Sequence, residues 1–209
     1  MKNRRILFFD VDTQKDFIEP DGALYVPAAE TLKPTFKQMI LYARTHEIPI
    51  WGSVDAHTEQ DQELSRNNGP FPDHCMQGSS GQQKIPETAP PKPRWIKNRI
   101  YSEEELQRAM KHTGEIYFEK QTYNMFDNPN LSKMVTGYDP VIIFGVATDY
   151  CVLAAALGFR KLDKAVFVVE DAIKPVSSEG EQKALKEIRE SGANFIKTDA
   201  ISDGLLFRI

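Results

Sequence analysis

The chain has 209 residues, of which 41% are hydrophobic and 27% are charged, a composition typical of a soluble globular protein. This length fits one domain covering residues 1–209 better than two. The net charge of −4 predicts no general attraction to nucleic acid or to an anionic membrane.

The sequence gives little indication of a signal peptide or of a membrane-spanning segment. Asp10 and Asp12 interrupt the first apolar run too soon for a signal peptide, and no stretch approaches the length of a membrane span. The two cysteines, Cys75 and Cys151, do not form a disulfide framework. We therefore expect a cytoplasmic protein without a membrane partner, and the sequence leaves homo-oligomerisation open.

Short apolar runs alternate with helical patterns along the chain, which indicates a parallel sheet built from βαβ units. The predicted strands are residues 6–11, 49–54, 115–119, 141–146, 165–169 and 194–197. Most are continuous apolar runs, as expected for strands that are covered on both faces. The prediction is an α/β protein, a three-layer αβα sandwich around a six-stranded, mostly parallel sheet.

Helical patterns lie between these strands. The predicted helices are residues 30–45, 102–111, 149–161, 179–190 and a short one at 201–207. Ser102 with Glu105, and Ser178 with Glu181, have the spacing of capping boxes at two helix starts. Residues 58–99 break the alternation as one irregular insertion, which includes four prolines between positions 86 and 93. Irregular loops of this size are usually functional or disordered.

Reactive side chains follow four of the predicted strands. They are Asp12 after the first strand, Asp55 and His57 after the second, Lys120 after the third and Cys151 after the fourth. In an open parallel sheet, ligands bind beyond the carboxyl ends of the strands, near the point where strand order reverses. The sequence therefore predicts one site at one edge of the sheet.

Cys151 is the candidate nucleophile. It lies in the first turn of the predicted helix 149–161, with Thr148 as the candidate N-cap. Free N–H groups and the helix dipole favour an anion there, so we expect a stabilised thiolate and donors for an oxyanion. A lone cysteine is more often a small buried hydrophobe. The carboxylate and the lysine predicted nearby favour the catalytic interpretation.

Asp12 and Lys120 are the candidate partners of this cysteine. A carboxylate at the end of an apolar strand is costly unless it is exposed, capping or paired. Asp12 would take the thiol proton and return it to the leaving amine. The alternative is a turn or N-cap aspartate, which we expect for Asp10 and Asp16. Lys120 would be a surface lysine by default, but here it could stabilise both the thiolate and the carboxylate.

Asp55, His57 and His74 are candidate ligands of a divalent metal. Asp55 and His57 are two residues apart, so both side chains face the same way on an extended segment. Each histidine alone is more often structural, but together they supply mixed oxygen and nitrogen ligands that suit zinc, iron or manganese. We expect zinc. Three protein ligands would leave open positions for water or substrate.

These segments resemble the nicotinamidases, within the isochorismatase-like cysteine hydrolase superfamily. The matching segments are Val-Asp-Thr-Gln-Lys-Asp-Phe at 11–17, Asp-Ala-His at 55–57, Phe-Pro-Asp-His-Cys at 71–75, Glu-Lys at 119–120 with Tyr123, and Gly-Val-Ala-Thr-Asp-Tyr-Cys at 145–151. The resemblance implies the isochorismatase-like, Rossmann-like hydrolase fold. It implies hydrolysis of nicotinamide to nicotinate and ammonia through a thioester on the cysteine, a reaction of NAD salvage that needs no organic cofactor.

The resemblance also assigns roles to individual residues. It implies that Asp12, Lys120 and Cys151 form the triad, that Asp55, His57 and His74 hold the metal, and that the N–H groups of Ala147 and Cys151 form the oxyanion hole. It further implies a cis peptide between Val146 and Ala147. The expected substrate-binding residues are Phe17, Phe71, Tyr123 and Gln14, with the two phenylalanines on either side of the substrate ring.

The chain departs from relatives in the insertion. Many relatives carry tryptophan where this chain has Phe71. A further metal ligand, His or Glu in different relatives, lies between the first two ligands and the last, and Glu63 is the best candidate with Glu59 as the alternative. Residues 86–99 also look longer than in compact relatives.

Two other functions stay open from the sequence. A related cysteine hydrolase could act on another small amide or carbamoyl compound, although such relatives generally lack the Asp-x-His and later His. A non-catalytic metal- or ligand-binding protein could share the fold. The isochorismatase branch lacks the nucleophilic cysteine and is disfavoured by Cys151.

Overall fold

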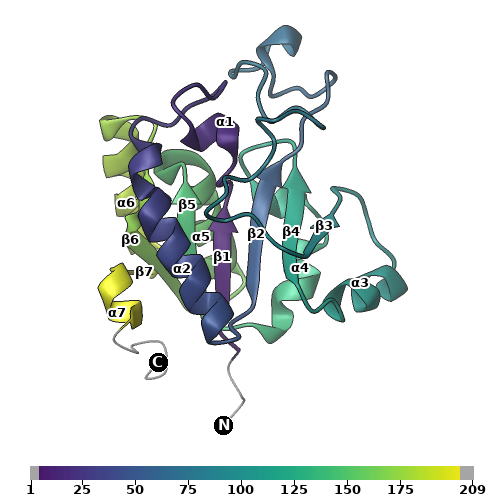
Figure 1. Cartoon of the computed structure of the whole chain (residues 1–209), viewed down its shortest axis with the longest axis vertical. Helices are drawn as coiled ribbons and strands as arrows, with labels where there is room; N and C mark the ends of the chain where they lie inside the picture. Colours follow the sequence, from purple (N-terminus) through teal and green to yellow (C-terminus); the bar gives the residue numbers. More distant parts are fainter. Residues whose placement is uncertain (1–4, 203–209) are drawn as a thin grey trace.

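A parallel sheet of seven strands forms the centre of the computed structural model, which describes residues 5–202 (Figure 1). The strands are β1 (Leu7–Val11), β2 (Ile50–Asp55), β3 (Pro93–Ile96), β4 (Glu115–Lys120), β5 (Val141–Val146), β6 (Val166–Lys174) and β7 (Asn194–Ile196). Their order is β3-β4-β2-β1-β5-β6-β7, and every neighbouring pair is parallel.

Helices cover both faces of this sheet (Figure 1). The α-helices are α1 (Lys15–Ile18), α2 (Lys33–Thr45), α3 (Glu103–Met110), α4 (Leu131–Met134), α5 (Leu153–Lys161), α6 (Ser178–Glu190) and α7 (Thr198–Ser202). One core cluster joins one face of the sheet to α1, α2 and α7, and another joins the opposite face to α3, α4, α5 and α6. The three-layer αβα prediction is therefore confirmed.

The apolar patterns explain this arrangement. Every residue of β1, β2 and β5 is buried, because these central strands are covered on both faces. In α2 the buried side chains Phe36, Met39, Ile40 and Ala43 recur at helical spacing and form one apolar stripe.

The strand order reverses beside β1. On one side of β1 lie β2, β4 and β3, which the chain forms first, and on the other side lie β5, β6 and β7. The crevice between the carboxyl ends of β1 and β5 is the usual ligand-binding position in such sheets. Asp12 follows β1 and Cys151 follows β5, so the topology places both residues at this crevice.

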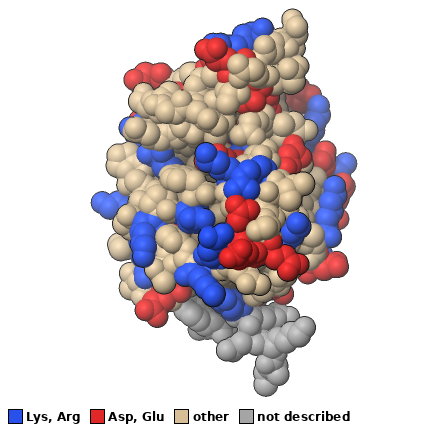
Figure 2. Space-filling view, turned by 90° about the vertical axis from the view of Figure 1, so that its right-hand side faces the viewer, with Lys and Arg blue, Asp and Glu red and all other residues tan. Residues whose placement is uncertain are grey.

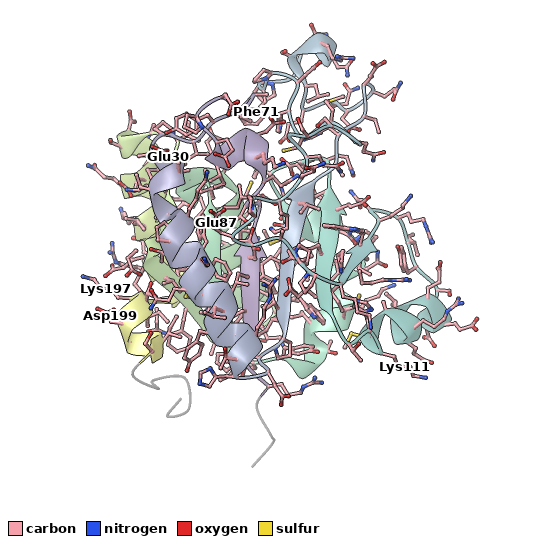
Figure 3. All side chains as sticks on the ribbon, in the orientation of Figure 1. Glu30, Phe71, Glu87, Lys111, Lys197 and Asp199 are labelled. Atoms are coloured by element: carbon pink, nitrogen blue, oxygen red, sulfur yellow. The ribbon has the colours of Figure 1, made fainter. Side chains whose placement is uncertain are left out.

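The long segment between β2 and β3 rises over the carboxyl ends of the strands (Figure 1). Isolated bridges pair Gln14 with Lys84, His57 with Met76, and Leu64 with Phe71. Figure 3 labels Phe71 at this end of the molecule, close to α1. The insertion is therefore an ordered cover over the crevice, although it has little regular secondary structure.

The prediction of six strands was wrong, because β3 lies inside the segment predicted as irregular. This edge strand pairs only with β4, has two exposed residues among four and begins at a proline, so it lacks the apolar pattern of a central strand. Strand β6 also continues to Lys174, beyond the predicted end at residue 169. Exposed Glu170 and Asp171 coincide with a shift in its register against β5, and pairing resumes at Ile173.

Two predicted helix starts needed correction. The capping box of Ser102 and Glu105 is confirmed at α3, but α6 is capped by Ser177, whose side chain accepts a hydrogen bond from the Gly180 N–H, and not by Ser178. Thr148 is not an N-cap, because Ala147 takes that position. The predicted helix at 201–207 overlaps α7 only at its start, and residues 203–207 lie outside the described residues.

The surface carries charges of both signs. Figure 2, which faces the β3 and α3 side, shows acidic and basic side chains interspersed. Within residues 5–202, none of the helices combines the length and the apolar character that crossing a bilayer requires.

Phe159 tests the core beneath α5. Its ring is fully buried, with ring centroids 4.9 Å from Phe9 and 5.1 Å from Phe126. Phe159→Ala is expected to lower the free energy of unfolding by about 3–5 kcal/mol, because it leaves a cavity between strand and helix. Urea denaturation measures this loss. The control Leu41→Ala, at a side chain that is 60% exposed, should change stability by less than about 0.5 kcal/mol.

Candidate active site

The strand ends bring the predicted reactive residues together. Asp55 and Lys120 are register partners on β2 and β4, and Val11 and Gly145 are partners on β1 and β5. Asp55 and Lys120 therefore lie at the same edge of the sheet as the residues that follow Val11 and Gly145, which include Asp12 and Cys151.

Lys120 is the centre of this cluster. Its ammonium nitrogen Nζ lies 2.9 Å from Asp12 Oδ2 and 3.6 Å from Cys151 Sγ, and it also contacts Asp55 Oδ1. The side chains of Lys120 and Asp12 are fully buried, and Asp55 and Cys151 are nearly so. The predicted triad thus occupies one contiguous site, and the cation lies between two carboxylates.

The backbone around Cys151 is unusual. The Val146–Ala147 peptide is cis, as the family resemblance implied. Gly145 has φ +123°, and a Cβ there would lie 2.0 Å from the Val11 carbonyl oxygen, so only glycine fits. Cys151 lies in a π-helical turn, Thr148–Val152, ahead of α5.

This turn places backbone N–H groups beside the Cys151 side chain. The Ala147 carbonyl accepts hydrogen bonds from the N–H groups of Tyr150 and Val152, the residues on either side of Cys151. Ala147 and Cys151 are each 7% exposed, and both line the cavity described below. Their N–H groups are the candidate oxyanion donors.

The electrostatics favour a proton on the cysteine. Burial raises the pKa of the Cys151 thiol well above its usual value; Lys120 opposes this rise, whereas Asp12 and Asp55 add to it. Burial also raises the pKa of Asp12, against the effect of Lys120. Burial alone would lower the pKa of Lys120, but Asp12, Asp55 and Cys151 raise it well above its usual value.

The expectation of a stabilised thiolate therefore needs correction. Burial and the two carboxylates favour the neutral form of the Cys151 thiol, and the same carboxylates favour the protonated form of Lys120. Helix N-termini do favour anions, but burial of the sulfur, together with the two carboxylates beside it, raises the pKa of the thiol despite that effect. A thiol beside a buried carboxylate of raised pKa is the arrangement that general-base activation requires.

Four side chains beside the triad could hold a metal ion. One ligand atom from each of Asp55, His57, Glu63 and His74 lies within 4.8 Å of all the others. Asp55 Oδ2 is 3.4 Å from His74 Nε2 and 3.7 Å from His57 Nε2, and Glu63 Oε2 is 3.6 Å from His57 Nε2. These separations suit atoms that converge on a common cation.

The hydrogen bonds of the two histidines support this interpretation. His57 Nδ1 lies 3.3 Å from Asp61 Oδ2, and His74 Nδ1 lies 2.7 Å from the Pro72 carbonyl oxygen. Such partners orient a ligating histidine and leave Nε2 free for a metal. His57 Nε2 is buried and has no hydrogen-bond partner among the described residues. The residues therefore fit a divalent cation.

Glu63 rather than Glu59 completes the quartet. The Glu63 side chain is 9% exposed, and its Oε1 accepts a hydrogen bond from the Tyr123 N–H. The Glu59 side chain is 73% exposed and pairs with Arg66. Spacing along the sequence could not separate the two, because the loop conformation decides which carboxylate turns inward.

A cavity of about 530 Å³, open in part to solvent, extends from Cys151 to three members of the quartet, Asp55, Glu63 and His74. Its lining residues are Phe17, Leu24, Tyr25, Val26, Asp55, Glu63, Phe71, His74, Tyr123, Val146, Ala147, Tyr150, Cys151 and Val176. The expected positions of Phe17, Phe71 and Tyr123 at the cavity agree with this lining. Sequence reasoning missed the wall formed by residues 24–26 and by Tyr150 and Val176, since nothing in their local pattern separates them from ordinary loop residues.

Gln14 does not line the cavity, contrary to its expected contact with substrate. Its side chain is fully buried and holds the backbone of Asp55: Oε1 accepts from the Asp55 N–H at 2.7 Å, and Nε2 donates to the Asp55 carbonyl at 2.8 Å. Nε2 also donates to the Gln82 carbonyl at 2.8 Å. Gln14 therefore supports a candidate metal ligand from below.

Comparison with known proteins agrees with this geometry. Residues 92–200 match the model of the isochorismatase domain family, and the chain belongs to this family. The nicotinamidase of Escherichia coli (strain K12) is 25% identical over 196 residues, which cover 83% of this chain and 85% of that protein. The nicotinamidase of Saccharomyces cerevisiae is 23% identical over 216 residues, with coverage of 89% and 96%.

Solved structures share the fold. The pyrazinamidase of Pyrococcus horikoshii, solved in complex with zinc, superposes with a TM-score of 0.75 at 27% identity, over 92% of this chain and 99% of that chain. Family membership and these relatives indicate a hydrolase that acts on amide bonds.

Lys120→Met tests the electrostatics of the site. It is expected to slow alkylation of Cys151 by iodoacetamide at pH 7, because loss of the cation raises the pKa of the thiol further. An opposite charge this close typically moves a pKa by about 1–3, so the rate should fall on the order of tenfold or more. Peptide mass spectrometry separates Cys151 from the buried Cys75. Lys183→Met, at a side chain that is 70% exposed, is the control, and equal rates in both variants would contradict the assignment.

Proposed function

We propose that the protein is a nicotinamidase, which hydrolyses nicotinamide to nicotinate and ammonia with Cys151 as the nucleophile. The observation that carries this proposal is one cavity lined both by Cys151 and by three members of the quartet, Asp55, Glu63 and His74. A cysteine triad alone would suit many small amides. The adjoining metal quartet favours a substrate with a ligating ring nitrogen, and the nicotinamidase relatives support that choice.

The aromatic side chains of the cavity support a flat ring as the ligand. Phe17 and Phe71 both contact His74, with ring centroids 5.5 Å and 6.1 Å from the imidazole. A ring bound next to His74 would therefore lie close to both phenylalanines. Tyr150 lies next to Phe71, 5.6 Å between ring centroids, and extends this aromatic wall toward Cys151.

The first half of the proposed reaction forms a thioester. Asp12 removes the proton from the Cys151 thiol, and Sγ attacks the carboxamide carbon of the substrate. The N–H groups of Ala147 and Cys151 stabilise the negative charge on the carbonyl oxygen. Asp12 then gives its proton to the leaving nitrogen, the C–N bond breaks and ammonia departs.

The second half regenerates the enzyme. Asp12 removes a proton from water, and the hydroxide attacks the thioester carbon. As the C–S bond breaks, Asp12 returns this proton to Sγ, and the acid product loses its own proton to solvent and leaves as nicotinate. Lys120 stays protonated throughout and stabilises the carboxylate form of Asp12 and the sulfur as it gains negative charge. A divalent ion, with zinc as the first choice, would be held by Asp55, His57, Glu63 and His74 and would supply an electrophilic contact that orients the ring nitrogen.

Ammonia release from nicotinamide by the purified, zinc-supplemented protein tests the function. Cys151→Ala is expected to abolish release while the thermal unfolding midpoint stays nearly unchanged, because the alanine fills most of the same space. Release that persists in this variant would contradict the proposed nucleophile. Release that is absent from the wild-type protein, with carbamoyl compounds hydrolysed instead, would assign the same chemistry to a different substrate.

Removal of the metal tests the quartet. Treatment with a chelator is expected to abolish ammonia release, and added Zn²⁺ should restore it. In calorimetric titration, Glu63→Gln should weaken Zn²⁺ binding by more than about tenfold, since even residues that only support metal ligands have effects of that size. Glu59→Gln is the matched control and should bind Zn²⁺ as the wild type does. Equal affinities for the two variants would remove Glu63 from the site.

A further inference from the structure

A second buried ion pair lies beneath the active site and takes no part in the proposed chemistry. Lys84 Nζ is 2.9 Å from Asp10 Oδ2, and the two side chains are 2% and 0% exposed. The ammonium also lies over the Tyr117 ring, 4.6 Å from its centroid. Desolvation of both charges is costly, and a buried pair is weak evidence for stability by itself. Its position in the fold indicates a different role.

The pair belongs to a network on one face of the sheet. The Tyr117 hydroxyl donates to Glu115 Oε2 at 3.0 Å and lies 3.4 Å from Asp10 Oδ2. Arg44 Nε of α2 donates to Glu115 Oε1 at 2.8 Å. Asp10 is thus held from the sheet side, and Lys84 is the member of the network that comes from the long segment between β2 and β3.

Residues 81–85 of that segment are paired with the residues that follow Asp12. The Lys15 N–H donates to the Gln83 carbonyl at 2.8 Å, the Asp16 N–H to the Gly81 carbonyl at 3.1 Å, and the Ile85 N–H to the Thr13 carbonyl at 3.0 Å. Residues 13–16 and 81–85 thus form a short two-stranded unit outside the main sheet.

Side chains reinforce this unit from below. Thr13 Oγ1 donates to Asp10 Oδ1 at 2.9 Å and lies 2.6 Å from Thr88 Oγ1. Lys84 adds its ion pair with Asp10 from the opposite segment. Asp10 therefore receives one partner from each of the two paired segments.

The paired unit supports the active site in two places. It begins directly after Asp12, whose backbone has φ +48°. This left-handed conformation is unfavourable for aspartate and persists only where the surrounding structure fixes it. It also contains Gln14, which binds the Asp55 backbone on one side and the Gln82 carbonyl on the other. Asp55 is both a member of the metal quartet and a partner of Lys120.

We propose that Lys84 and Asp10 are positioning residues, which hold residues 81–85 against residues 13–16 and thereby fix Asp12 and Asp55 relative to Cys151. The proposal goes one step beyond the proposed function and rests on it for the roles of those residues. Neither Asp10 nor Lys84 is among the residues that line the cavity.

The test uses a double variant, because Lys84→Met alone leaves Asp10 as an unpaired buried carboxylate and can prevent folding. Asp10→Leu/Lys84→Met removes both charges and is expected to fold. Three quantities are measured for it: the alkylation rate of Cys151 at pH 7, Zn²⁺ affinity by calorimetry, and kcat and KM for nicotinamide. Alkylation and Zn²⁺ affinity should each fall on the order of tenfold, and kcat should fall more than KM rises, because displaced catalytic groups weaken the chemical step.

Two further variants make the test specific. Tyr117→Phe removes a buried hydroxyl from the same network but keeps the ring under Lys84; it should lower thermal stability and leave the alkylation rate and Zn²⁺ affinity unchanged. Thr88→Val removes one side-chain contact between the paired segments without touching a charge. It should lower the alkylation rate, the Zn²⁺ affinity and kcat about twofold to threefold. If the double variant does not fold, this variant provides the test of the positioning role.

The outcomes separate this proposal from the proposed function. A folded double variant with wild-type alkylation, Zn²⁺ affinity and kcat would overturn the positioning role, as would an unchanged Thr88→Val if the double variant is unfolded. A wild-type protein that releases no ammonia from nicotinamide would overturn the function alone, since alkylation and Zn²⁺ binding still report the positions of Cys151 and Asp55.

Discussion

The contact on which the site depends is the buried ammonium of Lys120 between Asp12 and Asp55. It is fully buried and cannot be solvated, so its charge must be balanced by carboxylates within the fold. Asp12 belongs to the candidate cysteine site, and Asp55 belongs to the quartet that could hold a metal ion. One lysine therefore joins the two halves of the candidate active site, and displacement of either carboxylate disturbs both.

This constraint accounts for several unusual features nearby. Asp12 adopts a left-handed backbone conformation, and Gly145 is needed because β1 and β5 approach too closely for a side chain. Gln14 fixes the Asp55 backbone through both its N–H and its carbonyl group. Positions with a strained backbone, or with room for only one residue type, therefore cluster at the crevice between β1 and β5, where a fold of this kind binds its ligands.

The segment between β2 and β3 both carries residues of the candidate site and packs beneath it. It supplies His57, Glu63 and His74 to the quartet and Phe71 to the cavity. Its later part runs back beneath the site, where Lys84 pairs with Asp10. A loop that carries ligands must be held firmly if they are to converge, and backbone pairing with residues 13–16 supplies that restraint without a regular element.

The sequence by itself determined the αβα layers and the reactive residues at the strand ends, because apolar periodicity and parallel connections leave few arrangements for such residues as Asp12 and Cys151. Only the tertiary structure decided what depends on contacts between distant segments. Those include edge strand β3, whose polar residues carry no strand pattern, and the choice of Glu63 over Glu59. They also include the raised pKa of the Cys151 thiol, which depends on burial and on charges at the ends of three other strands that no local pattern encodes.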